Sequence, residues 1–313
     1  MDKQILEFDT VILGGGPAGL SASIYTSRGA LKTAIIDISM LGGQPSNYLE
    51  LENYPGFGSI KGFELMENFE NHADMFGVEK FYMQEIINID LKSEIKTIET
   101  YENIFKAKTI IIATGAQPRK LGIKGEKEFL SRGVSYCAVC DGAFYKDKTV
   151  AVIGGGNAAV EEGTYLTKFA KKVYIIHRRD TLRADKVAQL RAFQNEKVEF
   201  IWDTVPVEIQ GDKLVENLII KNVKTDEVSE LAVDGVFPYI GFSPNIGQLN
   251  GMMKQDELGF ICCNANLETS IDGVFVAGDV RVTPLRQVIT AAADGAIAGC
   301  SAVRYLENQK VTV

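Results

Sequence analysis

Apolar, β-branched runs alternate with glycine turns and helical stretches along this chain of 313 residues. The first run covers residues 8–13, and a glycine turn and a helical stretch to about Arg28 follow it. A second run, Leu31–Ile36, ends at Asp37. A short apolar run bounded by glycine is typical of a strand that is buried on both faces. The pattern therefore predicts a strand–turn–helix–strand unit at the start of the chain.

The same order of elements returns in the middle of the chain. Residues 149–153 form another β-branched run, followed by a glycine turn, a helical stretch to about Ala170 and a run Val173–Ile176 that ends at His177. Asp37 and His177 each lie 23 residues after the first glycine of their turn (37 minus 14 and 177 minus 154). This repeat predicts two dinucleotide-binding βαβ units.

Each unit later closes on a strand that runs into a glycine and then a proline. These segments are Ile110–Gly115 with Pro118, and Gly235–Gly241 with Pro244. The second segment is not followed by a third unit. We therefore expect the crossings near Gly115 and Gly241 to be linkers between two domains.

The last part of the chain is predicted to return to the first domain. It offers one more buried strand, Val274–Ala277, and an alanine-rich helix from about Arg286 to Leu306. The predicted class is α/β, with two Rossmann-like, three-layer, dinucleotide-binding domains, the second inserted into the first. The expected domains are residues 1–116 together with 246–313 and, between them, residues 117–245.

The two glycine turns are candidate dinucleotide sites. The first glycine makes the turn, the second lets a pyrophosphate approach the backbone, and a small third residue lets helix pack on strand. A glycine turn alone is a weak signal and can hold no ligand, but here a strand precedes and a helix follows each one. The residues concerned are Gly14, Gly16 and Gly19 in the first turn, and Gly154, Gly156 and Ala159 in the second.

The residue after the second strand of each unit distinguishes the two sites. Asp37 can accept a hydrogen bond from an unphosphorylated ribose hydroxyl, which suits FAD or NAD. The second unit has His177, Arg178 and Arg179 there, with Arg183 close behind. Guanidinium groups bind a 2′-phosphate through paired hydrogen bonds, so the second site suits NADPH. The alternative is that these arginines are a solvated helix start.

Cys137 and Cys140 are a candidate redox pair. Two intervening residues let the thiols close into a small, reversible disulfide ring. Half of a zinc site would need a second cysteine pair at suitable spacing, and the adjacent Cys262 and Cys263 have poor ligand geometry. An inert pair of thiols is the other alternative. We expect Cys262, Cys263 and Cys300 to be packing residues.

Asp141 follows the pair directly. Splitting a disulfide leaves a thiolate that must gain a proton, and a carboxyl group beside the pair can supply it. An Asp-Gly turn formed with Gly142 is an equally good interpretation.

Bulk properties narrow the class of protein. The net charge of −8 makes nucleic-acid binding improbable. No apolar run reaches the roughly 18 residues of a spanning helix, and residues 1–4 do not resemble an export signal. Five cysteines in such a chain do not suggest a disulfide framework, and in a reducing cytosol a close pair favours a catalytic or metal-binding role. With only His72 and His177, we expect no metal site.

The ordered set of motifs resembles the low-molecular-weight thioredoxin reductases over essentially the whole chain. The set comprises Cys-Ala-Val-Cys-Asp-Gly at 137–142, the glycine turn at 154–159 and His-Arg-Arg-Asp at 177–180. The resemblance implies a cytoplasmic homodimer that carries hydride from NADPH through FAD to the cysteine disulfide and on to thioredoxin. It also implies that Cys140 faces the flavin and that Cys137 attacks the partner.

Further residues are assigned through this resemblance. Contacts to FAD are implied for Gly14, Gly16, Gly19, Asp37, Gly42, Gly43, Gln44, Asn53, Thr114, Gly115, Gly278, Asp279, Arg286 and Gln287. Contacts to NADPH are implied for Gly154, Gly156, Ala159, His177, Arg178, Arg179 and Arg183.

Two residues bear on the choice of partner. Arg132 matches a position that contacts thioredoxin in the family, whereas Ala143 stands where an aromatic residue is usual. Other possibilities are therefore a reductase for another thioredoxin-like or glutaredoxin-like protein and, from a different class, a non-catalytic dinucleotide sensor. Thiol titration before and after addition of NADPH separates a reductase from a sensor.

Overall fold

The chain forms two compact units in the computed structural model, which describes residues 3–47, 51 and 53–311. Unit 1 comprises Met1–Gln117 and Ser243–Val313, and unit 2 is Pro118–Phe242. The breaks lie at 117/118 and 242/243, close to the breaks at 116/117 and 245/246 that the sequence predicts. The two crossings pair as short strands, β7 (Ala116–Pro118) and β15 (Phe242–Pro244).

Unit 1 is built on a seven-stranded sheet of order β3-β2-β1-β6-β5-β4, in which β16 also pairs with β6. Strands β1, β2, β3, β6 and β16 run parallel, and β5 is antiparallel to both β4 and β6. The bounds are β1 (Gln4–Leu13), β2 (Thr33–Ile36), β3 (Glu79–Phe81), β4 (Ile86–Asp90), β5 (Lys96–Thr100), β6 (Asn103–Ile112) and β16 (Val274–Val276).

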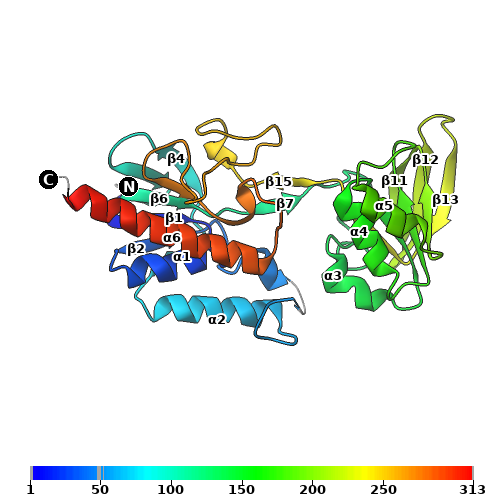
Figure 1. Ribbon diagram of the computed structural model, residues 1–313, viewed down its shortest axis with the longest axis horizontal. Helices are drawn as coiled ribbons and strands as arrows, with labels where there is room; N and C mark the ends of the chain where they lie inside the picture. The colour runs from blue at the N-terminus through cyan, green and yellow to red at the C-terminus, as the bar shows by residue number, and fades with distance from the viewer. Residues whose placement is uncertain (1–2, 48–50, 52, 312–313) are drawn as a thin grey trace. The chain divides into compact units, whose positions relative to one another are not determined.

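Both faces of this sheet are covered, which explains the continuous apolar strands. Ile12 faces a core shared with α1 and α6, whereas Val11 and Leu13 face the opposite core, which includes residues of β4, β5 and the segment 246–261. Figure 1 shows the helices of unit 1 on one side of its strands. The helices are α1 (Pro17–Arg28), α2 (Gly62–Asp74) and α6 (Val288–Val311).

Unit 2 repeats this layering. Its parallel sheet has the order β10-β9-β8-β14, and a second sheet, β11-β12-β13, is antiparallel. Val150 and Val152 pack on the α4 side, and Ala151 and Ile153 pack against the second sheet. The bounds are β8 (Thr149–Ile153), β9 (Lys172–Ile176), β10 (Val198–Ile201), β11 (Thr204–Gly211), β12 (Val215–Asn222), β13 (Val228–Ala232), β14 (Gly235–Pro238), α3 (Ala138–Asp141), α4 (Asn157–Leu166) and α5 (Lys186–Phe193).

The predicted α/β class with two Rossmann-like domains is confirmed, but three helix ends were wrong. Helix α4 ends at Leu166, before the expected Ala170, because the N–H groups of Lys168 and Phe169 bond three residues back instead of four. Helix α6 begins at Val288, after the expected Arg286, and continues to Val311, past the expected Leu306. The described residues also include the short 3₁₀ turns η1 (Gln44–Asn47), η2 (Gly142–Tyr145), η3 (Gly247–Leu249) and η4 (Gly278–Val280). Within the described residues, no helix is long and apolar enough to cross a membrane.

Candidate functional site

The first glycine turn joins β1 to α1 through tight backbone contacts. Gly14 has a φ of 103°, and its N–H donates to the carbonyl oxygen of Ile36 over 2.8 Å. An added Cβ on Gly19 would lie 1.8 Å from the Gly14 carbonyl oxygen, so only glycine fits there. Gly16 precedes α1 without a side-chain cap, which leaves N–H groups at the helix start for an anion such as a diphosphate.

Asp37 ties this turn to the end of β2. Its Oδ2 accepts the Gly15 N–H over 2.6 Å, and its Oδ1 accepts the Ser39 N–H and hydroxyl over 2.8 and 2.9 Å. A carboxylate offers about four acceptor positions, so capacity is left for a ribose hydroxyl. The side chain therefore fits the predicted role beside the turn.

Gly42 and Gly43 lie against the first turn. The Gly42 N–H donates to the Gly15 carbonyl oxygen over 2.8 Å, and an added Cβ on Gly43 would lie 3.1 Å from Gly16 Cα. Both residues have positive φ angles, 110° and 61°. The two glycine segments thus form a surface of bare backbone, which lets a flat or charged ligand approach closely.

The end of β6 adds a buried hydroxyl group beside the same turn. An added Cβ on Gly14 would lie 3.0 Å from Thr114 Cα. Thr114 Oγ1 is buried and has no hydrogen-bond partner among the described residues, so it can bond to a ligand. Gly115 follows with a φ of 72°, and the Gln44 amide donates to the carbonyl oxygen of Ala116.

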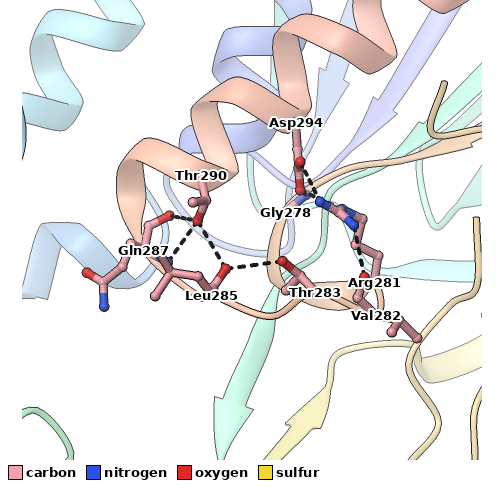
Figure 2. Close-up of polar contacts among 8 residues, drawn as sticks. All are labelled: Gly278, Arg281, Val282, Thr283, Leu285, Gln287, Thr290 and Asp294. Carbon is pink, nitrogen blue, oxygen red and sulfur yellow. Dashed lines mark hydrogen bonds and ion pairs between the residues drawn. The ribbon is translucent and has the colours of Figure 1, made fainter. Parts of the chain in front are cut away.

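The start of α6 brings distant residues to this region of unit 1. Asn53 Nδ2 donates to Gln287 Oε1 over 2.9 Å, although the two residues are 234 positions apart. Thr290 Oγ1 accepts the Gln287 N–H over 3.1 Å, as the side chain of the third helical residue does in a capping box. Figure 2 shows this cap, which accounts for the helix beginning at Val288 and not at Arg286.

Gly278 and Asp279 form the turn before α6. The Gly278 N–H donates to Asp294 Oδ2 over 3.0 Å, and Asp294 also binds Arg281 (Figure 2). Burial raises the pKa of Asp279 to about 6, against the opposing effect of the Arg286 charge. The turn therefore carries a carboxyl group that can hold a proton or accept a ligand hydroxyl near neutral pH.

The second glycine turn has the same construction in unit 2. Gly154 has a φ of 151°, and its N–H donates to the Ile176 carbonyl oxygen over 3.0 Å. An added Cβ on Gly154 would lie 2.4 Å from the Tyr239 carbonyl oxygen and 2.8 Å from Ala159 Cβ. Gly156 precedes α4 without a side-chain cap, and an added Cβ there would meet no atom of the described residues within 4 Å. The space beside Gly156 is open for a ligand.

The predicted phosphate-binding residues stand beside this turn. Arg178, Arg179 and Arg183 are exposed, and the described residues give their side chains no ion pair or hydrogen bond. The Arg183 N–H donates to the Gly155 carbonyl oxygen over 2.7 Å, which places this segment against the turn. Three exposed guanidinium groups next to an open glycine turn fit a phosphorylated dinucleotide.

His177 is buried behind the arginines rather than beside them in solvent. It is 5% exposed, and an added Cβ on Gly155 would lie 2.4 Å from its ring. Burial lowers its pKa, and the nearby charges of Arg183, Arg179 and Arg178 lower it further. The ring is therefore neutral near pH 7 and contributes packing under the turn.

Cys137 and Cys140 form a disulfide at α3, with Cα atoms 5.3 Å apart. The Cys140 N–H donates to Cys137 Sγ over 3.1 Å, and the Cys137 N–H donates to Ser135 Oγ over 3.1 Å. Asp141 ends the helix, and its N–H donates to the Cys137 carbonyl oxygen over 3.1 Å. Asp141 precedes Gly142 at the start of η2, so it both ends α3, the redox helix, and lies next to the cysteine pair.

The remaining cysteines are free thiols. Cys262 and Cys263 are half-buried, Cys300 is exposed, and burial raises the pKa of Cys263. The described residues contain no group of three or more side chains that could hold a metal ion.

Three residues of these sites escaped the sequence analysis. Asp294 interrupts an alanine- and glycine-rich helical run, which is a usable signal. Glu126 is 4% exposed and accepts the hydroxyl of Tyr136, the residue before Cys137, over 2.8 Å. Tyr239 accepts the Ala138 N–H over 2.7 Å. No local pattern distinguishes Glu126 or Tyr239, because their partners are distant in the sequence or in another element.

Comparisons with known proteins agree with this arrangement. The sequence profile of the pyridine nucleotide-disulphide oxidoreductases matches residues 8–295. A thioredoxin reductase of Bacillus subtilis is 46% identical over 309 residues, covering 98% of this chain and 97% of that protein. The chain belongs to the thioredoxin reductase family.

Solved structures give the same result. A thioredoxin reductase from Streptococcus pyogenes is 48% identical, with a TM-score of 0.83 over 96% of this chain and 99% of that one. A thioredoxin reductase from Lactococcus lactis is 46% identical, with a TM-score of 0.74 and the same coverage. The resemblance to the family is thereby confirmed, and the chain is an NADPH-dependent disulfide oxidoreductase that uses FAD.

Proposed function

We propose that this chain reduces the disulfide of thioredoxin at Cys137 and Cys140 with electrons from NADPH. The main support for this proposal is that the Cys137–Cys140 disulfide lies in the same unit as an open glycine turn and three exposed arginines. When bound, FAD accepts hydride from NADPH and delivers an electron pair to a disulfide. The residues of the chain bind and orient these groups and carry out the exchange of thiols.

Each unit holds one dinucleotide in this proposal. The bare backbone of the first turn, the Asp37 carboxylate and the unpartnered Thr114 hydroxyl support FAD in unit 1. The open position at Gly156 supports NADPH in unit 2. The proposed FAD residues are Gly14, Gly16, Gly19, Asp37, Gly42, Gly43, Gln44, Asn53, Thr114, Gly115, Gly278, Asp279, Arg286 and Gln287. The proposed NADPH residues are Gly154, Gly156, Ala159, Arg178, Arg179 and Arg183, with His177 supporting the site as a ring packed under the turn.

The two cysteines have different roles in the exchange. The Cys137 thiolate attacks one sulfur of the partner disulfide, which forms a mixed disulfide and releases the other partner sulfur as a thiolate. The Cys140 thiolate then attacks Cys137 Sγ, which restores the Cys137–Cys140 disulfide and releases the second partner thiol. Asp141 holds the proton that moves to and from the thiolate beside it. Two electrons pass to the partner in each cycle.

The proposed partner is thioredoxin or a thioredoxin-like protein, and the proposed assembly is a cytoplasmic homodimer. Thioredoxin is supported by the names of the relatives, and the dimer and the compartment by the resemblance to low-molecular-weight thioredoxin reductases. Phe144 follows the redox helix and is 59% exposed. It is an aromatic residue that a partner can still contact, although Ala143 stands where the family usually has another aromatic residue. Arg132 is proposed to contact the partner as its family counterpart does.

Trapping of mixed disulfides tests the division of roles. Cys140→Ser and Cys137→Ser variants are mixed with a thioredoxin that lacks its resolving cysteine and carries an activated mixed disulfide, and the products are separated on a non-reducing gel. Cys140→Ser should give a persistent covalent complex through Cys137. Cys137→Ser should give none, because the attacking thiol is gone. The opposite result would reverse the assignment.

The same preparation separates a reductase from a dinucleotide sensor. In the parent protein, NADPH should expose two new thiols per chain and should then drive thioredoxin reduction. A Cys300→Ser variant is the matched control, because Cys300 is a free thiol far from the disulfide in sequence. Its activity should equal that of the parent. Release of no new thiols from folded, flavin-bearing parent protein would contradict the reductase function.

A further inference from the structure

Tyr239 touches both functional parts of unit 2. It follows β14, and its N–H donates to the Ile153 carbonyl oxygen over 2.7 Å. Its own carbonyl oxygen stands against Gly154, where an added Cβ would lie 2.4 Å from it. At the end of its side chain, the Tyr239 hydroxyl oxygen accepts the Ala138 N–H over 2.7 Å. One residue therefore borders the second glycine turn and holds the first residue of the redox helix.

The hydrogen bond to Tyr239 gives the buried Ala138 N–H a partner, and burying that N–H without a partner would cost free energy. Ala138 is fully buried, and it is the first residue of α3. The side chain that precedes a helix bonds the N–H groups of the second or third helical residue, as Cys137 Sγ does with the Cys140 N–H. The Ala138 N–H thus needs a partner outside the helix, and Tyr239 is that partner.

Other contacts hold the approach to the pair but do not reach the glycine turn. The Ser135 N–H donates to the Val236 carbonyl oxygen over 3.1 Å, which fastens this segment to β14. The Tyr136 hydroxyl donates to Glu126 over 2.8 Å, and Glu126 also accepts the N–H of Leu121 over 2.7 Å. Tyr136 therefore serves as a comparison, since it is next to Cys137 but bonds a different part of unit 2.

We propose that Tyr239 is a positioning residue that couples the second glycine turn to the redox disulfide. Its hydroxyl group orients the peptide between Cys137 and Ala138, and its backbone moves with the turn that holds the dinucleotide. Ligand binding at the turn then steadies the start of α3. This inference rests on the proposed placement of NADPH at the Gly154 turn, whereas the effect of the hydroxyl on thiol exchange does not depend on that placement.

The first test compares two half-reactions in Tyr239→Phe holoenzyme. The rate at which NADPH bleaches the bound flavin should stay within about twofold of the parent rate. The kcat/KM for thioredoxin should fall roughly two- to tenfold, as expected for the loss of one hydrogen bond that orients the attacking thiol. An equal fall in both half-reactions, or no fall in either, would overturn the proposal.

Two control variants sharpen this comparison. Tyr174→Phe removes a hydroxyl group from β9 in the same unit, where the described residues show no hydrogen bond for it. It should match the parent in both half-reactions. Tyr136→Phe should slow thioredoxin reduction through the second contact. If Tyr174→Phe slows thioredoxin reduction as much as Tyr239→Phe, the effect is general loosening and the proposal is wrong.

The second test uses the parent protein and measures amide hydrogen exchange. Addition of NADP⁺ should slow exchange in a peptide that contains Ala138, and Tyr239→Phe should abolish this response while Tyr136→Phe keeps it. If NADP⁺ slows exchange around Gly154–Gly156 but not at Ala138 in the parent, the coupling is refuted and the proposed NADPH site stands. If it slows neither, the proposed placement of NADPH fails and the coupling falls with it.

Discussion

Asp294 binds Arg281 through both of its carboxylate oxygens. Arg281 Nε lies 2.6 Å from Oδ2 and Arg281 Nη2 lies 2.7 Å from Oδ1, and the side chains are only 18% and 8% exposed. Oδ2 also accepts the Gly278 N–H over 3.0 Å. A paired guanidinium and carboxylate thus hold the turn that carries Asp279 against α6 (Figure 2).

Replacement of Asp294 should destabilise unit 1 and release flavin. Asp294→Ala leaves the Arg281 charge partly buried without its carboxylate, which costs about 3 kcal/mol or more in the free energy of unfolding. Urea unfolding and the flavin absorbance retained after gel filtration measure the two effects. Asp226→Asn is the control, because it removes the charge from an exposed ion pair with Lys221 but keeps a residue type that tolerates the φ of 60° at this position, so it should cost less than about 1 kcal/mol. Equal losses in the two variants would contradict the role given to Asp294.

The raised pKa of Asp279 predicts a pH dependence of stability in the flavin-free protein. The folded-state pKa is about 6, against 3.8 for the ordinary group. The unfolded chain therefore loses this proton at lower pH than the folded protein. The stability that Asp279 contributes to the folded state is fully present below about pH 4 and is lost as the pH rises through 6. Asp279→Asn removes this dependence.

The parent and Asp279→Asn proteins should accordingly differ most above pH 6. The free energy of unfolding of flavin-free Asp279→Asn, minus that of the flavin-free parent, should be larger above pH 6 than at pH 4 by about 1 to 3 kcal/mol. Urea unfolding at both pH values gives the comparison. A constant difference across this range would show that Asp279 does not titrate between the two values.

The arginines after His177 should set the preference for NADPH over NADH. Each charge-assisted hydrogen bond to the 2′-phosphate contributes about 1.5 to 3 kcal/mol, so loss of two should raise the KM for NADPH roughly a hundredfold. Arg178→Ala/Arg179→Ala should leave the KM for NADH nearly unchanged. Arg191→Ala, on α5 in the same unit, should change neither value. Equal effects on both nucleotides would refute the assignment.

The open space at Gly156 predicts a defect in binding without a defect in folding. Among the described residues an added Cβ meets no atom within 4 Å, so Gly156→Ala should retain the parent's free energy of unfolding within about 1 kcal/mol. The methyl group should instead keep the dinucleotide from the backbone and raise the KM for NADPH at least tenfold. Gly58→Ala, where an added Cβ also meets no described atom within 4 Å, should change neither property. An unchanged KM in Gly156→Ala would place NADPH elsewhere.

The sequence by itself determined the parts of this protein that depend on neighbours along the chain. Strand, glycine turn and helix follow one another within each βαβ unit, so the turns at Gly14 and Gly154 could be predicted from local order and spacing. The same holds for the Cys137–Cys140 pair, since two intervening residues allow a ring. The contrast between Asp37 and the arginines after His177 also lies at one defined position after the second strand of each unit.

Tertiary structure decided the contacts that join separate elements. Asn53 meets Gln287, Asp294 reaches back to Gly278 and Arg281, and the Tyr239 hydroxyl meets the N–H of Ala138. Hydrophobic periodicity predicts which face of an element is buried but not which polar group of another element lies opposite. That choice depends on how helices and strands pack, because a hydrogen bond forms only where donor and acceptor approach within about 3 Å.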